Sequence, residues 1–494
     1  MANATESART KNEGRLAEVV KWFDSRLGLS YELLRPAPQY AINPFYWLGA
    51  LAVVAFVIQG VTGVMMMLYY VPSPAQAYSS TQYIFRDVSY GRFLETVHLY
   101  TAYAMIMLAF MHLMRGYFVS VHKKPRELMW VVGMVMGFVT LGLGFTGYLL
   151  PWTIVSKSAT DVGVGMIDAL PQPFSSFLSF LITGAGGDAT ELLRFYDLHI
   201  VVLPAVLLAL LAVKMYMLES HGISEPAAGV SSIPEEKRRL IPIFPDVSLY
   251  LLELAALFGS AMLMISVIFP LDLPPEYSPQ LAAQYTAQPD WYFLWIYQIL
   301  KISVFEGAGL PIALSVVTLI FMVLFLVPFI DRGETRKISK RMRFVTLGAI
   351  FMTEIAVLSI WGLVTPGRII PDEQAALVLG GTALLVAIIS VVTYGLLFPR
   401  WASGIASSGE VSTLVSARSA SILAAGSFVL LLAVGTFAIR STINALMEMI
   451  VRGPAITSFQ SLLLPLADLS LALVATMYLV YRFAADQSNG GLRR

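Results

Sequence analysis

The strongest constraint on this chain is a series of long apolar runs. A helix needs about 20 apolar residues to cross the hydrocarbon core of a bilayer. Runs of that length lie at residues 46–70, 95–118, 130–150, 196–218, 247–269, 310–330, 343–365, 374–397, 419–439 and 459–481. The composition agrees, because 57% of the residues are hydrophobic and only 13% are charged, about half the charged share of soluble domains. The sequence therefore predicts an all-α, polytopic transmembrane helix bundle of about ten spans.

Basic residues mark one face of this predicted bundle. Ten alternating spans place on that face both termini and the connections that hold Lys11, Arg15, Lys123, Lys124, Arg126, Lys237, Arg238, Arg239, Arg332, Lys337, Lys340, Arg341, Arg482, Arg493 and Arg494. By the positive-inside rule this face is cytoplasmic. The first residues lack the pattern of a cleaved signal peptide. We therefore expect a multi-pass protein of the cell membrane with both termini in the cytoplasm.

Polar breaks divide the chain into segments. Residues 15–28 have apolar side chains at helical spacing, which predicts a surface helix at the membrane interface. Polar stretches at 219–246 and 398–418 separate groups of spans, and the longest connections on the outer face, 151–195 and 270–309, have the length of functional loops. The expected segments are an interfacial N-terminal segment, a four-span module, a second module and two extra spans, at 1–40, 41–226, 227–400 and 401–494.

Charge and cysteine content exclude several functions. The formal net charge of +1 gives no indication of a nucleic-acid partner. The chain has no cysteine, so it forms no disulfide, no cysteine-ligated iron–sulfur cluster and no thioether-linked haem. Any iron–sulfur chemistry therefore belongs to another subunit.

Histidines indicate a cofactor. Three of the five, His98, His112 and His199, lie in apolar runs, where an ionisable residue is costly and marks a functional site. His98 and His112 are 14 residues apart, close to four helical turns, so they share one face about 21 Å apart. His199 lies near the outer end of the fourth run, level with His98. One such histidine alone often only bonds a neighbouring helix, but two levels on facing helices favour paired axial ligands of two stacked haems.

Glycines repeat the same interval. Gly49 and Gly63 on the first run, and Gly133 and Gly147 on the third, are also 14 residues apart. Glycine in a membrane helix lets a flat group or another backbone approach closely, although simple helix packing also uses it. Three runs with one shared interval therefore predict two levels of close approach.

Several motifs in order resemble the cytochrome b family of mitochondrial, bacterial and plastid quinol-oxidising complexes. They are Gln-Gly-Val-Thr-Gly, His-Leu-Met-Arg-Gly, Gly-Tyr-Leu-Leu-Pro-Trp, Arg-Phe-Tyr-Asp-Leu-His, Gly-Ile-Ser-Glu-Pro and Pro-Asp-Trp-Tyr-Phe, at 59–63, 112–116, 147–152, 194–199, 222–226 and 289–293. The last resembles the family's Pro-Glu-Trp-Tyr signature. The resemblance runs from about residue 15 to about residue 400 and leaves the last two spans as an extra module.

The resemblance implies a cytochrome b subunit of a quinol:acceptor oxidoreductase. Such a subunit oxidises quinol at an outer-face site, here between 151–190 and 289–293, and passes electrons through two haems in the four-span module, which contributes to proton translocation. The haems would be b-type by default or a modified type. Implied partners are a Rieske iron–sulfur subunit, cytochrome c-like or oxidase subunits, membrane lipid, and a second copy of the chain or a supercomplex. The substitutions described below suggest an archaeal or otherwise divergent branch.

The family pattern assigns the ligands. His98 and His199 match the outer pair, and His112 matches one ligand of the inner haem. The family's remaining histidine, 15 residues after the first in plastid-type members, falls at Lys214. A lysine that loses its proton can bind a metal, so we expect Lys214 as the inner ligand. A lysine extended to the headgroups, ligation by His221, and an inner haem with no sixth protein ligand are the alternatives.

Other site residues follow from the same motifs. Asp290 is the candidate proton acceptor for quinol, since a low-dielectric pocket raises the pKa of a carboxyl; an aspartate after proline also caps helices. Tyr292 and Tyr148 are candidate hydrogen-bonding partners of quinol. Arg115 and Arg194 are expected to face haem propionates or lipid headgroups.

Two positions depart from the family. Glu95 stands where the family has an arginine three residues before the first histidine, and Glu219 stands where it often has a histidine beside an inner quinone site. The competing classes are a haem-containing membrane anchor of a dehydrogenase or oxidase supercomplex and a secondary transporter. A transporter usually has inverted repeats and broken helices, and neither is visible in the sequence.

Overall fold

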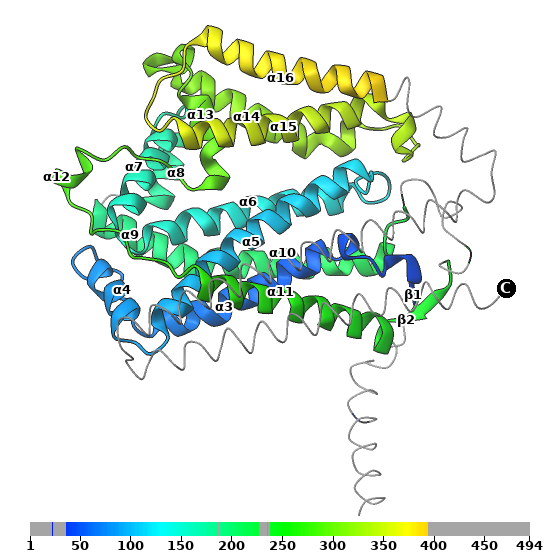
Figure 1. The fold of residues 1–494 in the computed structure, drawn as a ribbon, viewed down its shortest axis with the longest axis horizontal. Helices are drawn as coiled ribbons and strands as arrows, with labels where there is room; N and C mark the ends of the chain where they lie inside the picture. The colour runs from blue at the N-terminus through cyan, green and yellow to red at the C-terminus, as the bar shows by residue number, and fades with distance from the viewer. Residues whose placement is uncertain (1–21, 23–35, 185–186, 227–234, 236–237, 394–494) are drawn as a thin grey trace, which may run out of the picture.

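Eight long helices run side by side in the computed structural model, which describes residues 22, 36–184, 187–226, 235 and 238–393 (Figure 1). Each is long and apolar enough to cross a membrane: Leu48–Met67 (α3), Gly91–Phe118 (α5), Glu127–Leu149 (α6), Asp188–His221 (α9, η3 and α10), Ser248–Ile268 (α11), Gly307–Ile330 (with α14), Met342–Val364 (α15) and Asp372–Val392 (α16). They match the first eight predicted runs, which confirms the all-α polytopic bundle. The runs at 419–439 and 459–481 and the surface helix at 15–28 fall outside the described residues, Trp22 excepted.

Large apolar side chains on these helices point outward. Leu252, Leu377 and Leu384 are 64%, 76% and 62% exposed. Water would penalise so much apolar surface, whereas lipid tails are as apolar as leucine and helices satisfy their own backbone hydrogen bonds. The distribution of side chains therefore fits a protein surrounded by lipid.

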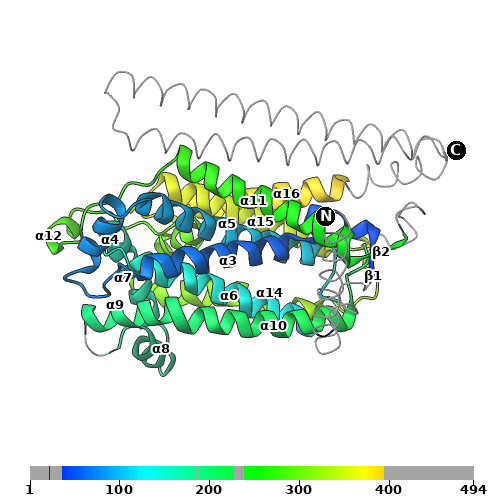
Figure 2. The same ribbon diagram turned by 90° about the horizontal axis from the view of Figure 1, so that it is seen from below.

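Four helices form a bundle in the first half of the chain. α3 packs along α5, α6 packs along α10 (Leu203–His221), and α5 contacts α6. α11 covers α3 and α5 from one side (Figure 2). We call α3, α5, α6 and α10 together the four-helix bundle.

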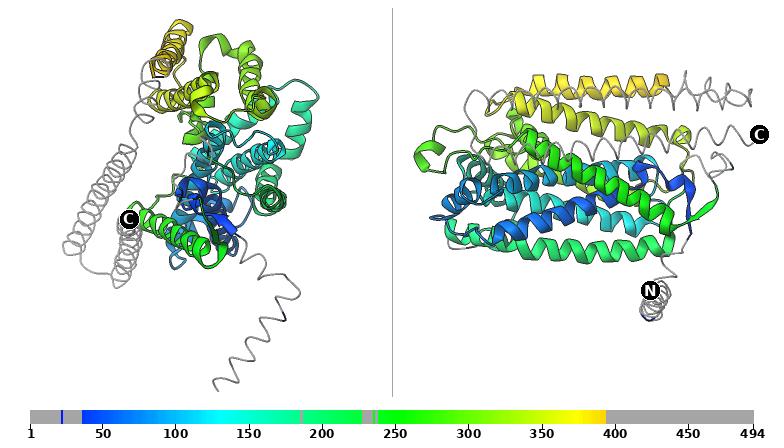
Figure 3. Two further views of the ribbon diagram at one scale, coloured as in Figure 1. Left: turned by 90° about the vertical axis from the view of Figure 1, so that its right-hand side faces the viewer. Right: turned by 60° about the horizontal axis from the view of Figure 1, so that its bottom comes forward.

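A second group of helices lies beside this bundle. α15 packs against α16 and against the short α13 (Leu294–Leu300), and α14 (Leu310–Ile330) packs against α6 (Figure 3). Trp130 of α6 donates its Nε1 hydrogen to the carbonyl of Leu324 at 2.9 Å. The two groups therefore meet along the α6–α14 contact.

Connecting segments pair at both ends of the helices. One end, which we call the loop end, carries α4 (Ala77–Arg86), α7 (Ile154–Asp168), α8 (Phe174–Ile182), α9 (Asp188–Asp197) and α12 (Pro279–Ala282) (Figure 1). There the backbone of Thr153 pairs with that of Glu276. At the opposite end, the basic end, β1 (Pro36–Pro38) pairs antiparallel with β2 (Leu240–Pro242). The loop end therefore brings the long connections 151–195 and 270–309 together.

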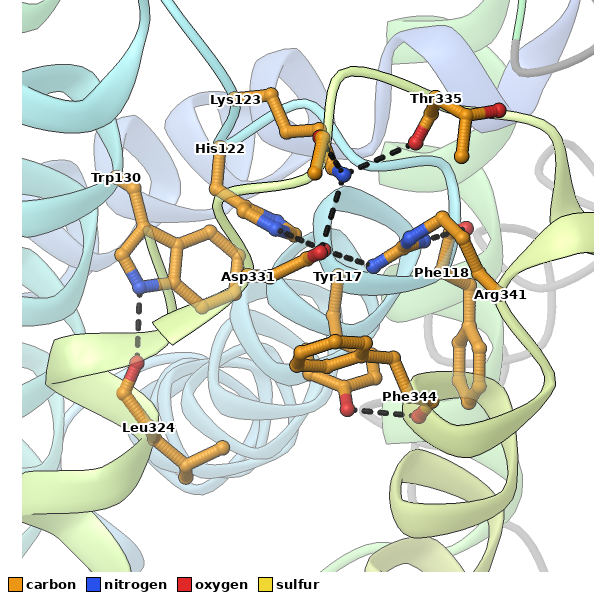
Figure 4. Close-up of polar contacts among 11 residues, drawn as sticks. Tyr117, Phe118, His122, Lys123, Trp130, Leu324, Asp331, Thr335, Arg341 and Phe344 are labelled. Atoms are coloured by element: carbon orange, nitrogen blue, oxygen red, sulfur yellow. Dashed lines mark hydrogen bonds and ion pairs between the residues drawn. The ribbon is translucent and has the colours of Figure 1, made fainter. Parts of the chain in front are cut away.

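A buried ionic cluster, the Asp331 clamp, joins the groups at the basic end. Figure 4 shows His122, Lys123 and Arg341 converging on Asp331, and all four are at most 8% exposed. Lys123 Nζ lies 3.0 Å from Oδ1 and His122 Nε2 lies 3.0 Å from Oδ2, while Arg341 binds Oδ2. Lys123 also donates to the carbonyl of Thr335 at 2.9 Å. Because His122 and Lys123 follow α5 whereas Asp331 follows α14, the clamp ties the four-helix bundle to the second group.

The carboxylate of the clamp stays ionised. Burial by itself raises the pKa of Asp331, but hydrogen bonds from Lys123 and His122 and the charge of Arg341 outweigh it and hold that pKa below its usual value. Burial lowers the pKa of His122, which is therefore neutral at pH 7. Since the unfolded carboxyl has a pKa of about 3.9, the stability from Asp331 is fully present above about pH 4 and is lost as the pH falls below it.

We expect Asp331→Ala to destabilise the protein strongly, since it leaves buried cations without their counter-ion, at a cost of about 3–5 kcal/mol. The midpoint of thermal unfolding in detergent measures the effect. Asp272→Ala is the matched control, because Asp272 pairs with Arg92 at 2.6 Å while 93% exposed, and exposed pairs contribute about 1 kcal/mol or less. Equal shifts in the two variants would contradict the assignment of the clamp.

Candidate haem and quinol site

Each predicted ligand at the loop end lies against a glycine of a neighbouring helix. A methyl group added to Gly63 of α3 would lie 3.4 Å from Cε1 of His98 on α5. One added to Gly147 of α6 would lie 2.5 Å from Cε1 of His199, closer than real contacts allow. Gly147 therefore makes room for the imidazole of His199, whereas a methyl group at Gly63 would meet His98 at an ordinary contact distance.

The same arrangement recurs toward the basic end. A methyl group added to Gly49 of α3 would lie 3.0 Å from Cε1 of His112, and one added to Gly133 of α6 would lie 3.0 Å from Nζ of Lys214. The two glycines of α3 thus face the two candidate ligands of α5. The two glycines of α6 face His199 in η3 and Lys214 on α10. Lys214 occupies the fourth position of a set whose other three members are histidines.

The imidazoles of His98 and His199 face each other across the bundle. Their ring centres are 6.2 Å apart and their planes are inclined by 68°. Two imidazoles bound to opposite sides of one metal ion, with metal–nitrogen bonds of about 2 Å each, have ring centres roughly 6 Å apart. The pair therefore fits the axial ligation of a haem iron.

Hydrogen bonds fix which nitrogen of each ring is free. Nδ1 of His199 lies 3.1 Å from the carbonyl oxygen of Leu143 and 3.3 Å from Oγ1 of Thr146. Because a carbonyl only accepts, Nδ1 carries the hydrogen and Nε2 keeps its lone pair. Nδ1 of His98 lies 2.8 Å from Oγ1 of Thr62, whose own hydrogen goes to the carbonyl four residues back. Both rings therefore keep a lone pair on Nε2, the form in which a histidine can bind a metal ion, and the hydrogen bonds at Nδ1 fix the orientation of each ring.

The level toward the basic end has unsatisfied groups. Nδ1 of His112 is buried without a hydrogen-bond partner. Within the described part of the chain the Lys214 amine forms no hydrogen bond or ion pair, and it lies close enough to His112 for their charges to repel. Because buried polar atoms are normally satisfied, the unpaired Nδ1 of His112 fits a site that a further group completes.

An apolar layer separates the two levels. Ala55, Met105 and Leu207 form a buried cluster contributed by α3, α5 and α10. Met105 is seven residues from both His98 and His112, and thus about 10 Å along the helix from each. This apolar cluster therefore separates the level of His98 from the level of His112.

His199 lies in a π-helical turn, η3 (Leu198–Val202). Leu203 N–H donates to the carbonyl of Leu198, five residues back. Pro204 follows at once and has no N–H to continue the ordinary helical pattern. Such turns occur often at functional sites, and this one marks the start of α10.

The predicted quinol residues meet at the loop end. Asp290 precedes the 3-10 turn η7 (Trp291–Phe293) and accepts a hydrogen bond from Trp291 N–H at 3.2 Å, so it caps this turn. Its oxygens also accept from the hydroxyl of Tyr103 on α5, at 2.9 and 2.8 Å. Tyr292 is buried, and its hydroxyl lies against Gly144 of α6. The motif 289–293 thus contacts both α5 and α6.

Burial and hydrogen bonds shift the pKa of Asp290 in opposite directions. Burial raises the pKa of its carboxyl, whereas the hydrogen bonds from Tyr103 and Trp291 lower it, and burial outweighs them. Tyr148, at the end of α6, is near enough for the charge of Asp290 to act on it. Tyr103 was missed in the sequence, because its position on α5 outside the quoted motifs gave no signal.

Three further predicted positions are Arg115 and Glu95 on α5 and Arg194 on α9. Arg115 stacks on Tyr46 at 4.1 Å, and Arg194 donates to the carbonyl of Phe180 at 2.8 Å. Glu95 has no hydrogen-bond or ion-pair partner within the described residues. That Arg115 and Arg194 face haem propionates or lipid headgroups stays a prediction.

Together the helices and the paired levels define a haem-binding electron-transfer protein of the membrane. The family model for cytochrome b/b6/petB matches residues 35–222, and the model for cytochrome b (C-terminal)/b6/petD matches residues 280–378. The chain belongs to the cytochrome b family, as the resemblance predicted. Neither model reaches residues 401–494.

Individual proteins agree with this assignment. The cytochrome bc complex cytochrome b subunit of Chlorobaculum thiosulfatiphilum is 34% identical over 349 residues, covering 69% of this chain and 79% of that protein. Cytochrome b of Sulfolobus acidocaldarius is 30% identical over 395 residues, covering 74% and 69%. A solved hyperthermophilic respiratory Complex III has the same fold, with a TM-score of 0.59 and 24% identity over 77% of this chain and 98% of that one.

Replacing His98 or His199 by Ala is expected to remove the haem of the loop-end level, since a metal site loses affinity with each ligand. Haem content per chain and the low-spin absorption bands of the purified protein measure the loss. His221→Ala is the control, because His221 is exposed and its Nδ1 bonds the carbonyl of Met217 at 2.8 Å. Full haem content in both His98→Ala and His199→Ala would refute the ligand assignment.

Proposed function

We propose that this chain is the cytochrome b subunit of a quinol-oxidising bc-type complex. In this proposal the protein holds two haems in the four-helix bundle and oxidises quinol at the loop end. The observation that carries it is the pairing of four candidate ligands with four glycines at two levels of one bundle. Haem, when bound, supplies the one-electron transfer.

The orientation follows from charge. The described part of the basic end includes Lys123, Lys124, Arg126, Arg332, Arg336, Lys337, Lys340 and Arg341. The positive-inside rule places such connections in the cytoplasm. The loop end and its quinol pocket then face outward, and protons released there leave the cell, which contributes to proton translocation.

The first partner of this proposal is a Rieske iron–sulfur subunit. Quinol oxidation releases two electrons, and a chain without cysteine cannot hold a cysteine-ligated cluster for one of them. The acceptor therefore lies on another subunit, which docks near the quinol pocket at the loop end. A cytochrome c-like or oxidase subunit follows the Rieske subunit as electron acceptor.

Asp290 is the proposed proton acceptor. It stands at the junction of the motif 289–293 with α5 and α6, and its carboxylate is bonded to Tyr103, five residues from His98 on the same helix. A quinol hydroxyl that approaches this carboxylate can transfer its proton to it. Tyr148 and Tyr292 lie around the carboxylate and offer hydroxyls to orient the quinol ring.

We expect Asp290→Asn to leave haem content unchanged and to slow quinol-driven haem reduction about 100-fold or more, since an amide cannot act as the base. Stopped-flow spectroscopy of the complex purified with its partners measures the rate. Asp272→Asn, at an exposed carboxylate of the same end, is the control. Wild-type turnover of Asp290→Asn at every pH would reduce Asp290 to its capping role.

Lys214 is the proposed second axial ligand of the inner haem, opposite His112. Its amine lies against Gly133 of α6, inside the bundle, rather than extended toward the headgroups. A charged lysine within a span costs about 2.5–3.5 kcal/mol even on an insertion scale. Binding the metal as a neutral amine removes that cost.

His221 is a poorer candidate for this position. α10 is a regular helix from Leu203 to His221, so His221 lies about 10 Å beyond Lys214 along the axis. Its Nδ1 is bonded to Met217 and its side chain is exposed. His221 could reach the level of His112 only if the end of α10 were unwound, and α10 is helical through His221.

Spectra of two Lys214 variants test the amine. Lys214→His should keep a low-spin inner haem, whereas Lys214→Leu should leave that haem high-spin or absent, since leucine offers no lone pair. Near-infrared magnetic circular dichroism of the oxidised protein distinguishes lysine from histidine ligation. An unaltered low-spin spectrum with unchanged potentials in Lys214→Leu would exclude the amine as a ligand.

A further inference from the structure

The hydrogen bond between Tyr103 and Asp290 does not follow from the motif at residues 289–293, because Tyr103 lies outside that motif. Tyr103 lies on α5, 187 residues from Asp290 in the sequence, and its hydroxyl is almost equally far from both carboxylate oxygens, at 2.9 and 2.8 Å. One phenol hydrogen shared between two oxygens points along the axis of the carboxylate. The phenol therefore fixes the direction in which the carboxylate faces.

The side chain at position 290 is shorter than the one in the signature that this chain resembles. The signature that this chain resembles has glutamate where Asp290 stands, and aspartate is one methylene shorter. A shorter acid stays closer to its own backbone, here the start of η7. The hydroxyl of Tyr103 reaches this carboxylate and ties it to the helix that carries His98 and His112.

The ring of Tyr103 is itself held in place. Its centre lies 6.3 Å from that of Trp291 with the planes at 83°, and 6.4 Å from that of Tyr292. The contact with Trp291 is edge-to-face and the contact with Tyr292 is tilted at 59°, and aromatic pairs at such distances stabilise each other. The two aromatic residues that follow Asp290 thus hold the tyrosine that binds it.

We propose that Tyr103 is a positioning residue of the quinol-oxidising site, which holds Asp290 as an oriented, ionised proton acceptor. The inference rests on the proposed function of Asp290. In the proton-transfer step a quinol O–H bond breaks and an O–H bond forms on Asp290, while the electron pair stays on the quinol oxygen. The hydrogen of Tyr103 stays on its phenol and continues to donate to the carboxyl group.

The surroundings of Asp290 predict a measurable pH effect. The titratable groups that face it are Tyr103 from α5, Tyr148 from α6 and Tyr292 from its own turn. Within the described residues no lysine, arginine or histidine forms an ion pair with it. Because Tyr103 donates to the ionised form, removing that hydroxyl raises the pKa of Asp290 further.

The test is the pH profile of quinol-driven haem reduction in Tyr103→Phe, measured in the complex with its native partners. The base must be ionised, so activity falls as the pH drops below its pKa. We expect the acid limb to move to higher pH by about one unit, with haem content and absorption spectrum unchanged. In the Asp290→Asn background, Tyr103→Phe should have no further effect on the rate.

Tyr100→Phe is the matched control. Tyr100 lies one turn earlier on α5, and its hydroxyl donates to the carbonyl of Phe269 at 2.8 Å, away from Asp290. Its loss should leave the acid limb where it is. Equal shifts in Tyr100→Phe and Tyr103→Phe would overturn the proposal, because they would show a general effect on α5.

The outcomes separate this proposal from the proposed function. If Asp290→Asn slows turnover but Tyr103→Phe leaves the pH profile unmoved, only the role of Tyr103 fails. If Asp290→Asn turns over normally, the function proposed for Asp290 fails first. Should Tyr103→Phe lose haem, 3-fluorotyrosine at position 103 keeps the ring and strengthens the donor. It should move the acid limb to lower pH, and no movement would refute the proposal.

Discussion

The close approach of the candidate haem ligands to glycines is the contact on which the rest of this molecule depends. α3 and α6 each present two glycines 14 residues apart, and the side chains of His98, His112, His199 and Lys214 fill the space that these glycines leave. A methyl group at Gly147 would collide with His199, and one at Gly49 or Gly133 would lie 3.0 Å from the facing side chain, tighter than ordinary contacts. The spacing of the four helices therefore follows from what must fit between them.

The proposed quinol site lies where two helix groups meet at the loop end. The first group supplies Tyr103 and Tyr148, and the second supplies Asp290 and Tyr292. Backbone pairing of Thr153 with Glu276 joins the two long connections at the same end. The polar groups at this junction connect to the helix that carries His98, since Tyr103 is five residues further along α5 and bonds Asp290.

The two ends of the molecule use buried carboxylates differently. Asp331 is surrounded by three nitrogen donors, two of them fully charged, and its pKa is lowered, so it is a fixed structural charge. Asp290 has only a phenol and a backbone N–H, and its pKa is raised. A carboxyl with few donors changes its protonation easily, which suits proton transfer, whereas the clamp suits rigidity.

Much of this protein could be predicted from sequence because the signals are local. Hydropathy fixed eight of the spans, and the 14-residue intervals placed His98 and His112 on one face, since a regular helix turns by a constant angle per residue. The partners of Tyr103 and His122 had no such signal. They lie 187 and 209 residues away, and nothing periodic in the sequence reports which helix groups pack together or at what height. Those pairings, and the position of Lys214 against Gly133, were decided only when the helices packed in three dimensions.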